Sequence, residues 1–221
     1  MEKETTEEKR NEMKETGSMK LDSNNRKHNV RLLTIIGEIE GHEGSSGTAK
    51  TTKNEHLIPR LAAYDENSEI QGILFILNTI GGDVSCGLAL AEMISGLKTP
   101  TASFIIGDSH SIGVPLAVAT DFSCIVPSAT MILHPVRMSG MILGAPQSYD
   151  QFEKIQARIV DFIIRKRGLT KKHVEELMMN TSMFAKDLGT LLVGGQAVEE
   201  GLVDKVGTLS DVMDYLKQCP H

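Results

Sequence analysis

Residues 70–84 read IQGILFILNTIGGDV, and this stretch decides the fold. Its first part, 70–77, is almost wholly apolar, as expected for a strand that is buried on both faces. The apolar run ends at a Gly-Gly pair, and a helical pattern follows over residues 84–97. A strand, a glycine turn and a helix in this order predict one unit of a parallel α/β sheet.

Comparable units precede and follow this stretch, so the expected fold class is α/β with a largely parallel sheet and right-handed crossovers. The second half is expected to be mainly helical, with a capping box at Ser148 and Gln151 opening its first helix. The expected strands are 30–39, 70–77, 101–106, 122–126, 130–133 and 202–206, and the expected helices are 57–62, 84–97, 111–119, 148–168, 170–180, 195–200 and one from 210.

The domain organisation follows from composition. Residues 1–29 contain no Val, Ile or Phe, and their seven acidic side chains balance seven basic ones. Such a segment cannot bury enough surface to order itself, so we expect a flexible charged tail. An exposed helix laced with ion pairs is the alternative. Residues 30–221 are expected to form a single domain, with a loop at 41–54.

Charge and composition exclude several function classes. The net charge is −6 and aromatic residues make up 4% of the 221 residues, which argues against a nucleic-acid partner. No apolar run is long enough for membrane insertion. Cys86, Cys124 and Cys219 are too few and too widely spaced for a disulfide framework or a zinc site, and they fit a reducing, cytoplasmic location.

Three junctions carry residues that could do chemistry. The Gly-Gly pair at Gly82 leaves backbone N–H groups free at a helix start, where an oxyanion could bind. Ser111 follows a predicted strand and opens a helix, and His134 ends a short apolar strand as a candidate general base. Taken singly, each has a plainer explanation: a turn, an N-cap and a core histidine.

Together these segments resemble the proteolytic subunit family of Clp protease. ILFILNTIGGDVSCGLALAEMISGLKTP resembles the family's strand, glycine turn and helix, and SFIIGDSHSIGVPLAVA resembles its nucleophile segment. ATMILHP resembles the segment of its catalytic histidine, and GGQAVEEGLVDKVG its closing motif. The chain is most similar to the divergent translocation-enhancing, TepA-type members. The resemblance implies a ClpP/crotonase-like fold of repeated β-β-α units with a helical extension, or handle.

The resemblance also assigns roles at the candidate site. Ser111 matches the family's nucleophile and His134 its general base. Gly82 and Ile112 match the residues whose backbone N–H groups form the oxyanion hole. Such a donor contributes about 2.7–4 kcal/mol to stabilising the transition state.

Two segments depart from the family. Ser109-His110 replaces the usual Ala-Ala before the nucleophile, and Gly189 stands where the family carries its catalytic acid. Asp187, two residues earlier, is the candidate third member of the triad, since two residues restore the same face of an extended chain. The alternative is an open dyad in which a backbone carbonyl, water or the Thr190 hydroxyl takes the place of the acid.

The resemblance implies a serine endopeptidase that hydrolyses peptides or unfolded proteins through an acyl-enzyme and assembles into a heptameric ring or double ring. No metal or organic cofactor is implied. Residues 136–147 occupy the place of the segment that interlocks two rings. The N-terminal tail does not resemble the family's short apolar axial hairpin, which argues against docking of an AAA+ ATPase.

Three other functions stay open at this point. A noncatalytic ring subunit would have lost its triad acid. A crotonase-fold acyl-CoA enzyme would share the glycine turn and the oxyanion hole. A Ser-Lys peptidase would need a suitably placed lysine, and the recognised motifs around Ser111 and His134 contain none.

Overall fold

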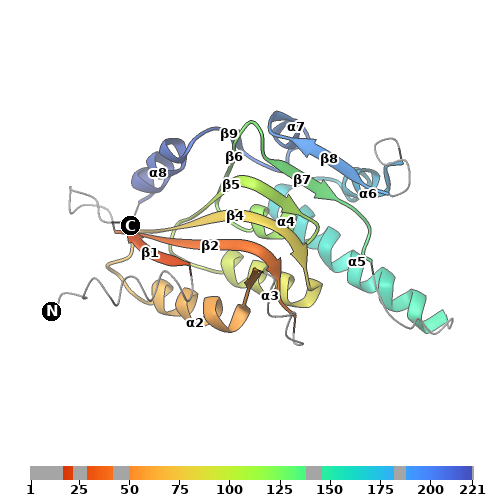
Figure 1. Ribbon diagram of the computed structural model, residues 1–221, viewed down its shortest axis with the longest axis horizontal. Helices are drawn as coiled ribbons and strands as arrows, with labels where there is room; N and C mark the ends of the chain where they lie inside the picture. Colours follow the sequence, from red (N-terminus) through yellow and green to blue (C-terminus); the bar gives the residue numbers. More distant parts are fainter. Residues whose placement is uncertain (1–16, 22–28, 42–49, 138–145, 182–187, 221) are drawn as a thin grey trace.

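The computed structural model describes residues 17–21, 29–41, 50–137, 146–181 and 188–220. Within these residues the strands form one sheet with the central order β1-β2-β4-β5-β6-β9. Every neighbouring pair on this path is parallel except β1 with β2, so the predicted mainly parallel α/β sheet is confirmed (Figure 1). The strands are β1 Ser18–Leu21, β2 Val30–Ile39, β3 Thr51–Thr52, β4 Gly72–Gly82, β5 Thr101–His110, β6 Phe122–Ile125, β7 Thr130–Leu133, β8 Thr190–Val193 and β9 Lys205–Val206.

Helices cover both faces of the sheet (Figure 1). In β4, Ile73 and Phe75 point into the larger core, whereas Leu74 between them packs in a smaller core with Leu216 of α8. This alternation explains the continuous apolar run of β4, because both of its faces are buried. The helices are α2 Asn54–Asp65, α3 Val84–Ser95, α4 Gly113–Val118, α5 Pro146–Arg167, α6 Lys171–Met179, α7 Gly195–Glu199 and α8 Leu209–Gln218.

The strands β4 and β5 run further than the sequence predicts, to Gly82 and His110. The first half of β5 pairs with β6 and its last residues pair with β7, while the pairing of β4 with β5 shifts register after Leu77. The strand β5 therefore serves two strand pairings in succession. Both the Gly-Gly pair and the residue before Ser111 are held within the sheet rather than in loops.

Asn78 bridges the place where β4 and β5 change register. Its Oδ1 accepts a hydrogen bond of 3.0 Å from the amide of Asp108. A Cβ atom placed on Gly107 would lie 2.5 Å from that same oxygen. Gly107 is therefore needed for the close approach, because any side chain there would displace Asn78.

The predicted tail departs from the structure at Ser18–Leu21. These residues form β1, which pairs antiparallel with the start of β2. The open edge of β2 presents unpaired backbone groups with which this segment pairs, and Leu21 adds a contact with the core beneath α8. Residues 1–16 and 22–28 lie outside the described residues.

The second half differs from prediction at three points. The helix α5 begins at Pro146, so Ser148 lies within its first turn and is not its N-cap. The strand β8, which pairs antiparallel with β7, was not predicted. The late strand expected at 202–206 is shorter in the structure, where β9 spans only Lys205–Val206. The helix expected at 170–180 is confirmed as α6, and Thr170 is its N-cap, accepting a 3.2 Å bond from the His173 amide.

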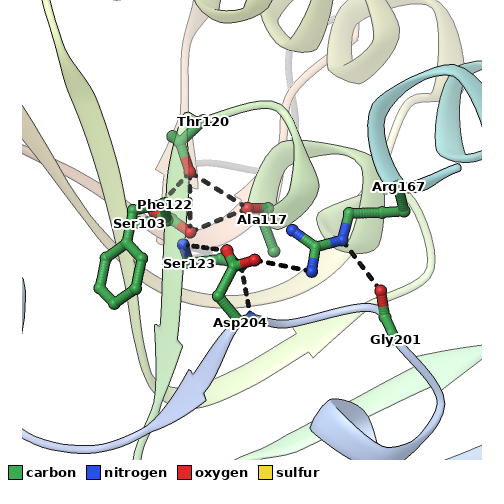
Figure 2. A network of polar contacts seen from close by, with 8 residues as sticks. All are labelled: Ser103, Ala117, Thr120, Phe122, Ser123, Arg167, Gly201 and Asp204. Atoms are coloured by element: carbon green, nitrogen blue, oxygen red, sulfur yellow. Dashed lines mark hydrogen bonds and ion pairs between the residues drawn. The ribbon is translucent and has the colours of Figure 1, made fainter.

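Asp204 clamps the end of α5 to the sheet (Figure 2). Its carboxylate accepts hydrogen bonds from the amide and hydroxyl of Ser123 on β6, at 2.8 and 2.7 Å, and from the guanidinium of Arg167 at 2.9 Å. Arg167 also donates to the carbonyl of Gly201 at 2.9 Å. The clamp fixes α5, whose inner face forms one wall of the candidate site.

The helix α5 extends away from the sheet in Figure 1, in the place where the helical extension is expected. Residues 138–145, which hold most of the segment expected to interlock rings, lie outside the described residues. Across the described ranges, no helix combines the length and the apolar character needed to cross a membrane.

Candidate active site

Ser111 sits in a strained turn between β5 and α4. Its φ of 57° is the only positive value among the non-glycine residues that the structure describes. Its amide donates a 2.8 Å bond to the carbonyl of Ile132 on β7, and its carbonyl accepts from Val114 in α4. A left-handed non-glycine residue at a strand-to-helix turn costs about 1–2 kcal/mol and is held only where neighbouring structure enforces it. Ser111 is half-buried in this turn and lies on the wall of a cavity.

The Gly-Gly pair packs directly against Ser111. A Cβ atom placed on Gly81 would lie 2.8 Å from the Cβ of Ser111 and 3.4 Å from the amide nitrogen of Ile112. A Cβ atom on Gly82 would lie 2.3 Å from the carbonyl oxygen of Ile39. Both glycines have positive φ, 96° and 146°. The backbone of Gly81 therefore closely approaches the turn at Ser111, and the backbone of Gly82 closely approaches β2.

Thr79 and Asp83 hold the Gly-Gly pair in place, and neither was singled out from the sequence. The buried Thr79 hydroxyl donates to the carbonyl of Gly37 at 2.6 Å and accepts from the amide of Gly81 at 3.1 Å. Asp83 caps α3 by accepting a 2.8 Å bond from the Cys86 amide. An Asp directly before an apolar helix is the sequence signal that would have found the cap.

His134 follows β7 and is oriented by a backbone group. Its Nδ1 lies 2.7 Å from the carbonyl oxygen of Pro135. Because a carbonyl oxygen only accepts, Nδ1 carries the proton and Nε2 of the neutral ring is left as the acceptor. The carbonyl thus selects the tautomer that a general base needs, a role that an acid performs in a serine triad.

The position where the family's acid is expected lies beside His134 but has no room for a side chain. Gly189 directly precedes β8, and its φ is 135°. A Cβ atom there would lie 2.6 Å from the carbonyl oxygen of Leu133 and 2.9 Å from the Cβ of His134. The Thr190 hydroxyl turns away and donates to the Leu177 carbonyl at 2.6 Å. Asp187, the predicted third triad member, lies outside the described residues.

One cavity of about 150 Å³ brings the candidate residues together. Gly82, Ser111 and His134 lie on its wall, and aliphatic side chains supply most of the remainder. Ile112 is buried beneath it, so only its backbone can serve the site. The other lining residues are Val84, Val114, Leu133, Val136, Arg137, Ile159, Ile163 and Met178.

This arrangement provides three elements of acyl transfer: a hydroxyl, a neutral imidazole and backbone amides at a helix start. Ile112 is the N-cap of α4, next to Ser111. The carbonyl of Ile39 on β2 accepts a hydrogen bond of 2.9 Å from the amide of Asp83, the residue that follows Gly82. In the described residues, no group of three or more His, Cys, Asp or Glu side chains could hold a metal ion.

Comparisons with known proteins point to one protease family. The Clp protease family model matches residues 44–210. The translocation-enhancing protein TepA of Halalkalibacterium halodurans is 42% identical over 199 residues, which cover 87% of this chain and 78% of that protein. The ATP-dependent Clp protease proteolytic subunit 1 of Chlamydia muridarum is 26% identical over 155 residues, covering 67% of this chain and 77% of that subunit.

A third relative, the proteolytic subunit 1 of Protochlamydia amoebophila, is 28% identical over 138 residues, covering 61% of this chain and 64% of that subunit. The family match spans the Gly-Gly pair, Ser111, His134 and the closing motif. The sheet of this chain, with its long bent strands and the helix α5, is the ClpP/crotonase-like architecture. The chain therefore belongs to the Clp protease family and is a TepA-like member of it.

Proposed function

We propose that this protein is a serine endopeptidase that cleaves peptides or unfolded proteins through an acyl-enzyme. The observation that carries the proposal is the shared cavity of Ser111 and His134, with Ser111 held in the strained turn against the Gly-Gly pair. Membership of a protease family supports the same reaction class.

In the proposed mechanism the Ser111 hydroxyl attacks the scissile carbonyl carbon while Nε2 of His134 takes its proton. The amides of Gly82 and Ile112 bind the oxyanion of the tetrahedral intermediate. His134 then returns the proton to the leaving amine, and water repeats the sequence to release the acid product. The Pro135 carbonyl keeps Nδ1 protonated during these steps.

The cavity favours a peptide substrate with an apolar side chain. Its lining is mainly aliphatic, and about 150 Å³ suits one side chain of moderate size. Sites that enclose a whole small molecule or cofactor have about 300–1,000 Å³. This difference argues against an acyl-CoA enzyme. A Ser-Lys peptidase is also disfavoured, since the described residues that line the cavity include no lysine.

We further propose that the protein acts in the cytoplasm as a homo-oligomeric ring of seven subunits, or two stacked rings. Relatives named as Clp protease proteolytic subunits support assembly. Ile80 and Ile106 lie in the second halves of β4 and β5 and are 62% and 42% exposed, so an isolated subunit leaves two large aliphatic side chains in water. The free, buried thiols of Cys86 and Cys124 fit a reducing compartment. Light scattering measures the mass of the assembly and hence its number of subunits.

A noncatalytic ring subunit is the second candidate function, and one observation favours it. Gly189 leaves no side chain at the aligned position of the acid, and loss of a triad acid can lower the rate about 10⁴-fold. Docking of an AAA+ ATPase would be compatible with either function. It is tested by whether such an ATPase binds the assembled protein.

The test is hydrolysis of a fluorogenic peptide series that differs only in the residue before the scissile bond. Leucine or methionine is expected to be cleaved at least about tenfold faster than aspartate, because the cavity offers aliphatic walls. Ser111→Ala, with its fold intact, should lose this hydrolysis. Unchanged hydrolysis by Ser111→Ala would overturn the proposed function. Absence of hydrolysis in the assembled wild-type protein would favour the noncatalytic ring subunit.

A further inference from the structure

Three polar side chains form a closed triangle beside the candidate active site. Nε2 of His110 lies 2.7 Å from the Thr130 hydroxyl and 3.4 Å from the Asp108 carboxylate. The Thr130 hydroxyl in turn lies 3.0 Å from the same carboxylate. The side chain of His110 is 19% exposed, so the triangle is largely shielded from water on the histidine side.

The hydrogen positions in this triangle follow from chemistry. The Thr130 hydroxyl has one proton and donates it to the Asp108 carboxylate, which only accepts. The remaining bond must then run from Nε2–H of His110 to the Thr130 oxygen. His110 therefore acts as a donor, and it can do so as a neutral ring.

The triangle joins the two strands that carry the proposed catalytic pair. His110 ends β5 directly before Ser111, and Thr130 begins β7, which His134 follows. Asp108 and Thr130 are register partners across these strands. The bond from the Ser111 amide to Ile132 at 2.8 Å lies at the far end of the same pairing. The triangle thus braces the pairing of β5 with β7 at its first register pair.

The charge of His110 bears on His134. Burial lowers the pKa of His110 below its usual value of 6.5, Asp108 opposes this shift, and His134 adds to it. These are the described titratable groups that act on the ring. His110 is thus held neutral near pH 7, while a positive charge there would oppose the charge that His134 gains from the serine proton.

We propose that His110 is a positioning residue, which aligns Ser111 with His134 through Thr130 and keeps positive charge away from the general base. This inference rests on the proposed peptidase function. It predicts that position 110 needs a neutral hydrogen-bond donor.

Three variants separate these requirements: His110→Gln donates to Thr130 without charge, His110→Lys donates with a permanent charge, and His110→Leu does neither. The measurement is the rate constant of Ser111 phosphonylation by a fluorophosphonate probe at saturation, together with the probe's half-saturation concentration, from pH 5 to 9. Thermal melts show whether each variant is folded.

His110→Gln is expected to keep the rate constant within about twofold, and His110→Leu to lower it about tenfold at an unchanged half-saturation concentration, since alignment and not probe binding is lost. His110→Lys is expected to be about tenfold slower, with the acid limb of its pH profile moved to lower pH. A merely structural role would not move that limb. If His110→Leu does not fold, Thr130→Val and Thr130→Ser are measured instead. Of these two variants, Thr130→Ser is expected to retain the wild-type rate constant.

Equal rate constants for Gln, Leu and wild type would overturn the positioning role. Equal pH profiles for Lys and Gln would overturn the charge requirement. A wild-type protein that the probe does not label would instead overturn the proposed function, and this inference with it.

Discussion

The backbone of Gly189 lies directly against His134, since a Cβ atom on Gly189 would be 2.9 Å from the histidine Cβ. The position where the family's acid is expected therefore lies beside His134 but excludes a side chain. In its stead the carbonyl of Pro135, 2.7 Å from Nδ1, sets the tautomer of His134. A carbonyl orients the ring but brings no negative charge to balance an imidazolium, so we expect slower acylation than in a full triad.

Gly189→Asp should not restore a triad. The new side chain would collide with the Leu133 carbonyl, and a φ of 135° is strained for any residue but glycine. We expect a loss of about 1–3 kcal/mol in the free energy of unfolding and no gain in the phosphonylation rate. Gly168→Ala is the matched control, because Gly168 also has positive φ, 67°, but nothing within 4 Å of the added Cβ. A faster reaction of Gly189→Asp would contradict this view.

Gly81→Ala should disable Ser111 without unfolding the protein. The added methyl group would lie 2.8 Å from both the Ser111 Cβ and the His110 carbonyl oxygen, so the nucleophile turn must shift. A displacement of this kind can cost about 100-fold in rate. Gly195→Ala, where the added Cβ meets nothing within 4 Å, is the control. If both variants react at the wild-type rate, the Gly-Gly pair does not position the nucleophile.

The sheet could be predicted because its signal is local. The continuous apolar run of β4 and the strand that leads into Ser111 show their burial in their own residues. The strand β1 could not be predicted, because Ser18–Leu21 is ordered by pairing with the open edge of β2 and shows no apolar run of its own. The strand β8 was missed for a related reason: its pairing with β7 is long-range, and its residues are few.

Asp204→Asn tests the clamp between α5 and the sheet. Burial disfavours the charged carboxylate, yet the hydrogen bonds from Arg167 and Ser123 prevail and hold the pKa of Asp204 below its usual value of 3.8. The charged Asp204 carboxylate therefore stabilises the folded protein above pH 4, and this stabilisation is lost as the pH falls through the lowered pKa. We expect Asp204→Asn to lower the free energy of unfolding by about 1–2 kcal/mol at pH 7.

The same variant should lose less stability than the wild type between pH 5 and pH 3, because it has no carboxylate to protonate at this position. Urea unfolding at each pH measures both effects. Asp214→Asn is the control, since its partner Lys217 lies on the same helix and both side chains are well exposed. Parallel pH dependence of Asp204→Asn and wild type would show that the clamp contributes no linked stability.

Asp187→Asn decides between a dyad and a triad. If the Pro135 carbonyl alone orients His134, phosphonylation of the variant should stay within about twofold of the wild type. A loss approaching 10⁴-fold would place Asp187 in the triad. Asp150→Asn, an exposed change in the first turns of α5, controls for the loss of one negative charge.

Part of the site could be read from the sequence, and part could not. Ser111 and His134 belong to side-chain motifs at element ends, and the structure brings both to one cavity. The orienting group of His134 is a backbone carbonyl, which every residue carries and no motif marks. The bond of Thr79 to Gly37 links residues 42 positions apart, so its support of the Gly-Gly pair appears only after folding.

The central claim is that Ser111 is an activated nucleophile, and peptide mapping after fluorophosphonate treatment tests it most directly. We predict one phosphonyl adduct per chain, located on Ser111 and absent from folded Ser111→Ala. Ser109 provides an internal comparison, because its hydroxyl is buried and donates to the Gly113 carbonyl at 2.8 Å. An adduct on Ser109, an adduct that persists in Ser111→Ala, or no adduct on the assembled wild-type protein would contradict the claim.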